Sequence, residues 1–165
     1  MADLTMNTPR DFRGIVKKGR LDVGANVRVF VGQAMMAGPV GDSPHTGGIV
    51  NCASQAAADF VGFAAESVDN RLNTVPHGGA ARSCQTDLHV NGSVWLDVDN
   101  GAAWTFDDLG LVVYATDGNT FTTSSAGNAV KIGKVADADA AVTGGANTGR
   151  VLVEFNAAWS SLLIV

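Results

Sequence analysis

Histidine and cysteine are the side chains of this chain best suited to bind a metal ion. His77, Cys84 and His89 offer ligand atoms, but their spacings match no common zinc pattern. His45 and Cys52 lie in or near an earlier loop and complete no such pattern. We therefore expect ordinary turn histidines and free thiols, and no metal or other cofactor. A disulfide between Cys52 and Cys84 stays open, because pairing depends on proximity in space.

The acidic residues suggest calcium only weakly. The segment Asp97-Val-Asp99-Asn100-Gly101 resembles the opening of a calcium loop, and Asp108 falls at its twelfth position. The sixth position is Ala102 where Gly is required, and the usual Glu is missing. A polar turn after a strand is the expectation here. Neighbouring Asp107 and Asp108 would point to opposite sides of an extended segment, so they predict no acid–base pair.

No serine lies in the sequence context of a nucleophile elbow. The chain is therefore expected not to be an enzyme. Core or subunit-contact roles are the expectation for Trp95, Trp104 and Trp159 as a set, and Trp95 is the one with the outward parity on an expected strand. An exposed aromatic platform suits sugars, so the alternative function is a carbohydrate- or surface-binding β module that uses Trp95.

Residues 109–135 give the clearest structural pattern. Leu111 to Thr116 is apolar and β-branched, and Thr120 to Ser124 continues beyond the turn residues Asp117-Gly118-Asn119. We expect an antiparallel hairpin here, with positive φ at Gly118. Another turn at residues 125–128 leads to a third strand, Val130 to Val135, and such a meander predicts an all-β domain.

Further strands are expected along the chain, with one short helix within residues 51–58. The strand at 87–99 alternates apolar and polar residues, and it is either continuous or divided at Asn91-Gly92. Gly32, Gly62 and Gly133 each follow a β-branched residue, which weakly predicts corners of a curled sheet. The predicted fold is a small β-barrel or sandwich with an extended N-terminal arm and at most one or two short helices. The other expected strands are residues 27–31, 60–65 and 150–155.

Charge is scarce and unevenly distributed. Charged residues make up 16% of the 165 residues, hydrophobic residues make up 46%, and the net charge is -5. Residues 1–20 hold five basic and two acidic side chains, a net of +3, so the rest of the chain carries -8. We expect an extended arm over residues 1–25, a β domain over 26–156 and an apolar tail over 157–165. The acidic body would repel phosphates, so no nucleic acid partner is expected.

The first twenty residues lack the apolar core of a signal peptide, and no run approaches the length of a membrane span. Synthesis in the cytoplasm, with no membrane partner, is therefore the expectation. The low charge also suggests that part of the surface is buried against partners.

Three segments together resemble bacteriophage head decoration proteins, also called capsid cement proteins. They are "DFVGFAAESVDN" (59–70), "DLGLVVYATDGNTFTTSSAGNAVKIGKV" (108–135) and "GRVLVEFN" (149–156). The resemblance lies in the order and spacing of the segments, and it implies a structural virion protein. Such proteins bind the outer surface of the expanded head across junctions of the major capsid protein. They stabilise the head, and many of them are homotrimers.

Under this resemblance the basic arm becomes the expected capsid contact, and the apolar tail becomes the expected contact between subunits. The capsid-contact candidates are Arg10, Arg13, Lys17, Lys18 and Arg20. The subunit-contact candidates are Trp159, Leu162, Leu163, Ile164 and Val165. The expected location is the outer surface of the virion, and no cofactor is needed.

Overall fold

The computed structural model describes residues 6–7, 10–37, 48–52, 59–72, 78–80, 82–126, 130–138 and 148–157. The regular structure of these residues is strand apart from one short 3-10 helix, so the all-β prediction is confirmed. The expected helix within 51–58 falls mainly on residues outside these ranges. The elements are β1 Phe12–Asp22, β2 Val27–Val29, β3 Ala34–Ala37, β4 Ile49–Asn51, β5 Phe60–Ala64, β6 Val68–Asn70, β7 Gln85–Asp99, the 3-10 helix η1 Phe106–Asp108, β8 Val112–Ala115, β9 Phe121–Thr122, β10 Val130–Ala138 and β11 Thr148–Asn156.

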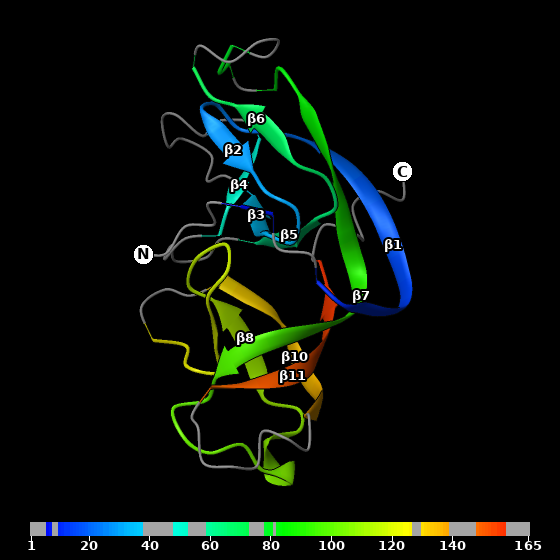
Figure 1. The fold of residues 1–165 in the computed structure, drawn as a ribbon, viewed down its shortest axis with the longest axis vertical. Helices are drawn as coiled ribbons and strands as arrows, with labels where there is room; N and C mark the ends of the chain where they lie inside the picture. Colours follow the sequence, from blue (N-terminus) through cyan, green and yellow to red (C-terminus); the bar gives the residue numbers. More distant parts are fainter. Residues whose placement is uncertain are drawn as a thin grey trace.

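The long strand β7 joins the two lobes of the molecule (Figure 1). It is continuous through Asn91-Gly92 rather than folded into a hairpin, and Gly92 adopts a φ of +138°. Its alternation is as predicted, since one face of the strand is buried in the core. That face consists of Leu88, Val90, Val94, Leu96 and Val98.

The second half of β7 belongs to a closed five-stranded barrel, with the order β7-β11-β10-β8-β9 and back to β7. Its longest strand pairing is antiparallel and joins β11 to β7, from Thr148 opposite Asp99 to Asn156 opposite Asn91. β9 closes the ring by a parallel contact with the end of β7. We call this part the barrel lobe, and it confirms the predicted barrel.

The first half of β7 belongs to a second group of strands, which we call the upper lobe. Here β1 lies on one edge of β7, and β5, β3 and β4 follow in order from the other edge. A single parallel bridge between Val23 and Ile49 links the end of β1 to β4. The small β2–β6 pair completes this lobe (Figure 1).

Most of the expected N-terminal arm is a regular strand of the fold. Residues 12–22 form β1, which pairs with β7 from Phe12 opposite Val94 to Asp22 opposite Gln85. The pairing shifts register on both sides of Lys17. Deleting residues 2–20 is therefore expected to expose one edge of β7 and to destabilise the body.

The predicted hairpin between β8 and β9 is confirmed, since Ala115 lies opposite Phe121. The meander is wrong in its order, because β8 lies between β9 and β10 and pairs with both. The turn is held by Asp117, whose carboxylate accepts hydrogen bonds from the backbone N–H of Asn119 and Thr120, both at 2.8 Å. These local bonds make the turn without positive φ at Gly118, so that prediction is wrong.

Two of the three predicted glycine corners are sites of close backbone approach. A Cβ on Gly62 would lie 2.5 Å from the carbonyl oxygen of His89, and one on Gly133 would clash with the carbonyl oxygen of Glu154. Each glycine lies beside a shift of register in its strand pairing. Gly32 lies in a turn instead, with a φ of +83°.

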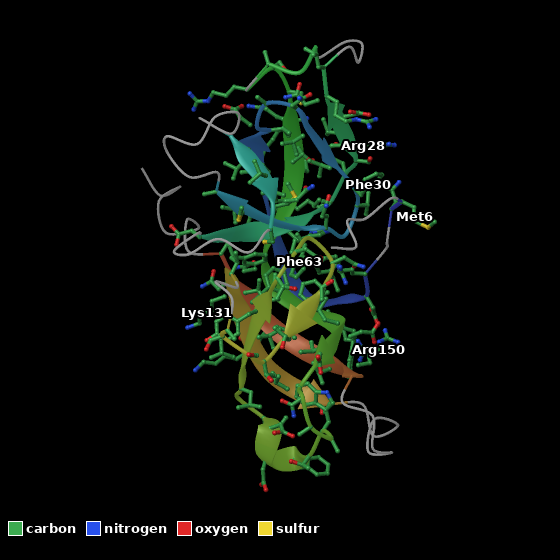
Figure 2. The ribbon with its side chains drawn as sticks, turned by 90° about the vertical axis from the view of Figure 1, so that its left-hand side faces the viewer. Met6, Arg28, Phe30, Phe63, Lys131 and Arg150 are labelled. Atoms are coloured by element: carbon green, nitrogen blue, oxygen red, sulfur yellow. The ribbon has the colours of Figure 1, made fainter. Side chains whose placement is uncertain are left out.

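An aromatic cluster joins the cores of the two lobes. Phe63 of β5 is fully buried at the waist between them (Figure 2). Its ring centroid lies 5.1 Å from that of Phe155 in β11 and 6.2 Å from that of Phe121 in β9. Phe12 and Phe60 pack around the same ring. Within the described ranges, no helix has the length and apolarity to cross a membrane.

Candidate functional site

Arg10 is half-buried where the two lobes meet, and its guanidinium contacts both of them. Its guanidinium carbon lies 4.8 Å from the ring centroid of Phe121 and 5.6 Å from that of Phe63. Its side chain donates hydrogen bonds to the carbonyl oxygen of Gly32 and, at 2.7 Å, to Asn119 Oδ1. Burial lowers the pKa of Arg10 to about 10, partly offset by the charge of Asp97. Arg10 therefore links the two lobes, and these internal contacts do not favour the expected role of Arg10 as a capsid contact.

The other basic candidates lie along β1. Arg13 and Arg20 are exposed but paired, Arg13 with Asp11 at 3.7 Å and Arg20 with Asp87 at 3.4 Å and Glu66 at 3.8 Å. Lys18 is exposed, and the backbone of Lys17 pairs with that of Asn91. The sequence placed these charges together correctly, but it did not show that acidic partners neutralise part of them.

Trp95 lies on the outward face of β7, as its parity predicted, but its ring is partly covered. The guanidinium carbons of Arg13 and Arg150 lie 5.5 Å and 5.6 Å from its centroid. Asp11 lies near both arginines, at 3.7 Å and 3.6 Å. These groups occupy ring surface on which a sugar would stack, so the arrangement does not favour the carbohydrate-binding alternative. Trp104 is instead buried, and its indole N–H donates to the carbonyl oxygen of Val98.

The thiols of Cys52 and Cys84 are both buried and free, and no disulfide joins them. Burial raises the pKa of both, so neither is an activated nucleophile. His89 packs against the ring of Phe12, with centroids 4.2 Å apart. Burial and the nearby charge of Lys18 lower its pKa.

The acidic residues of the calcium-like segment serve the local backbone. Asp99 Oδ1 accepts a hydrogen bond from the N–H of Gly101, and Asp108 Oδ2 accepts one from the N–H of Thr105. Among the residues that the structure describes, no three His, Cys, Asp or Glu side chains gather as a possible metal site. Asp107 and Asp108 lie in η1 rather than in an extended segment.

Sequence reasoning missed an exposed apolar loop at the free end of the barrel lobe. Phe106, Leu109 and Leu111 are 80%, 46% and 37% exposed, and we call these three side chains the knob. Their spacing combines a step of three residues with a step of two, so no single strand or helix period runs through all three. The available signal was the turn-forming sequence Asp107-Asp108 followed shortly by Gly110, because residues next to a surface turn tend to be exposed.

A groove of about 500 Å³ is lined by the start of β5 and by residues of β10 and β11. Its floor includes Phe60, Ile132 and Phe155, and its rim carries Lys131 and Glu154. The rim charges are mixed, and the groove brings no nucleophile and base together. The tail candidates Trp159, Leu162, Leu163, Ile164 and Val165 lie outside the described residues.

No protein-family model matches this chain, and no curated protein matches it either.

Proposed function

We propose that this protein is a structural virion protein that decorates the outer surface of a bacteriophage head and stabilises the expanded shell. One observation carries the proposal. The segments 108–135 and 149–156, which carry the larger part of the resemblance to decoration proteins, contain β8, β9 and most of β10 and β11. These strands, together with β7, form the closed barrel. The larger part of the resemblance therefore falls on four of the five barrel strands, and the segment 59–70 falls on β5 and β6 of the upper lobe.

The described surface is compatible with a binding role. Its polar groups serve the fold itself, as Arg10, Asp99 and Asp108 illustrate. The mechanism we propose is multivalent attachment. A homo-oligomer, expected to be a trimer, would place several weak contacts across junctions of the major capsid protein, and joining them on one particle makes the combined binding strong.

The test uses undecorated expanded heads of the phage that encodes the protein. Purified protein should sediment with these heads at a saturating stoichiometry and raise the temperature at which they release DNA. Heads that already carry their full complement are the matched control, because their sites are occupied. If the protein sediments with neither kind of head, it is not a decoration protein. Binding of the same purified protein to glycans would favour the carbohydrate-binding alternative.

Light scattering tests the oligomer separately. A chain that ends after Ala157 keeps the hydrogen bond from the Ala157 N–H to the carbonyl oxygen of Val90, and so retains the described end of the fold. A folded monomer would support the tail as the subunit contact, whereas an unchanged oligomer would contradict it.

A further inference from the structure

The knob formed by Phe106, Leu109 and Leu111 concentrates exposed apolar surface on one short loop. Single exposed apolar residues are ordinary, but three within six positions are a local cluster. Figure 1 shows η1 at the end of the barrel lobe, far from β2 and β6. Nothing in the fold requires these side chains to be apolar, because none of the three is buried in the core.

The loop that carries the knob is fixed at both ends. On one side, Trp104 is buried and its indole N–H donates to the Val98 carbonyl oxygen at 3.2 Å. On the other side, the N–H of Gly110 donates to the carbonyl oxygen of Val135 at 2.8 Å. The N–H of Val135 in turn donates to the carbonyl oxygen of Leu111 at 2.9 Å. The knob is thus held on the barrel by contacts that do not involve its own side chains.

The loop is also braced internally by Thr105 and Asp108. Asp108 Oδ2 accepts hydrogen bonds from the Thr105 N–H at 2.6 Å and from the Thr105 hydroxyl at 3.0 Å. The N–H of Asp108 in turn donates to the carbonyl oxygen of Thr105 at 3.1 Å. A binding loop that is ordered before it meets its partner loses less conformational entropy on binding.

The charge around the knob specifies what kind of surface would receive it. The loop itself carries Asp107 and Asp108 and no basic residue, and Asp107 is exposed between the knob residues. The stretch of β10 that is hydrogen-bonded to the loop through Val135 adds one basic residue, Lys134, and one acidic residue, Asp137. The charge beside the knob is therefore acidic on balance. A complementary partner would therefore offer an apolar pocket bordered by basic side chains.

We propose that the knob is a capsid-attachment point: Phe106 inserts into an apolar pocket bordered by Lys and Arg side chains on the shell protein. This inference rests on the proposed decoration function. The aromatic ring supplies the anchor, since such residues dominate the energetics of protein interfaces, and the nearby aspartates orient it. The attachment point is separate from β1, whose basic residues the sequence had favoured.

The experiment compares Phe106→Ser with Leu72→Ser in the sedimentation assay with undecorated heads. Leu72 is the matched control because it is 65% exposed but lies in the upper lobe, after β6. Phe106→Ser should weaken head binding by about tenfold or more, while Leu72→Ser should leave it unchanged. Asp107→Lys should also weaken binding, and this difference should shrink as the salt concentration rises. Both serine variants should melt like the wild type, because the replaced side chains are exposed.

The outcomes distinguish a failure of the knob proposal from a failure of the proposed decoration function. If the wild type binds heads and Phe106→Ser binds equally well, the knob is not the attachment point, although decoration stands. If the wild type binds no heads, decoration and the knob proposal fall together. If Phe106→Ser instead changes the mass of the free protein, the knob is a contact between copies. Loss of binding to lipid vesicles in Phe106→Ser would make it a membrane contact, and either result overturns the proposal.

Discussion

The barrel lobe and the upper lobe share β7, but they are held together by different interactions. The barrel closes through a long backbone ladder, with nine residue pairs between β7 and β11. The upper lobe contains three strands of only three residues each, β2, β4 and β6. An isolated bridge between Val23 and Ile49 links the end of β1 to β4. All three buried polar residues of the described chain lie in the upper lobe or its half of β7: Gln33, Asn70 and Thr86. The barrel lobe thus relies mainly on a long backbone ladder, whereas the upper lobe adds buried polar side chains to its short strands.

Asn70 shows how those side chains work. Its amide nitrogen donates to the carbonyl oxygens of Gly24 at 2.9 Å and Ala80 at 2.8 Å, and its amide oxygen accepts from the Ser83 hydroxyl at 2.6 Å. One buried side chain therefore satisfies backbone groups of two loops that no strand pairs. Gln33 has a similar role, because its Oε1 accepts from the N–H of Phe30 at 3.0 Å.

The largest expected effect is at the waist, where the lobes are not independent. Replacing Phe63 with Ala should lower the free energy of unfolding by ~3–5 kcal/mol, because the ring is fully buried among four other phenylalanines. Denaturant unfolding should stay a single transition, whether followed by tryptophan fluorescence or by circular dichroism. Two separate transitions, with that of the barrel unshifted, would show that the lobes unfold independently.

A smaller and more local effect is expected from Asn70→Ala. It leaves carbonyl groups of Gly24 and Ala80 without their donor, at a cost of ~1–3 kcal/mol. Amide hydrogen exchange should accelerate in β2 and β6 but not in β10 and β11. Glu154→Gln, at an exposed barrel position, is the control. Equal acceleration in both lobes would contradict a difference between them.

Gly118→Val tests the contact between the two lobes at the β8–β9 turn. A Cβ at Gly118 would lie 2.6 Å from the side chain of Gln33, so we expect a loss of ~1–3 kcal/mol from overpacking rather than from backbone strain. In a double-mutant cycle, Gln33→Ala should relieve part of that loss. Strict additivity of the two changes would rule out this contact as the cause.

The smallest effect is expected for an exposed ion pair. A hydrogen bond from Arg71 is the main reason that the pKa of Asp69 falls from an ordinary 3.8 to about 2. Because the folded pKa is lowered, the stabilisation is present above pH 3.8 and is lost as the pH falls towards 2. Asp69→Asn should therefore cost less than ~1 kcal/mol at pH 7, and thermal melts should converge with the wild type near pH 2. A difference that persists at pH 2 would point to another cause.

The amino-acid pattern was sufficient where a strand has one buried face. The alternation in β7 and β11 follows directly from their positions on a half-buried sheet, so Leu88 through Val98 and Val151 through Phe155 could be assigned in advance. The turn at Asp117 could be assigned for a similar reason, because its hydrogen bonds are local. The order of β8, β9 and β10 could not, since short strands carry little information about which neighbour they join.

The candidate surfaces were predicted less well, because exposure depends on what packs above each residue. The sequence by itself determined the all-β class, the main strands and the separation of basic from acidic segments. Only the tertiary structure decided that Arg10 lies over two phenylalanine rings, that two arginines partly cover Trp95 and that Phe106 faces solvent. Periodicity specifies which side of a strand is buried, whereas these contacts join residues distant in the chain and depend on how the two lobes close around β7.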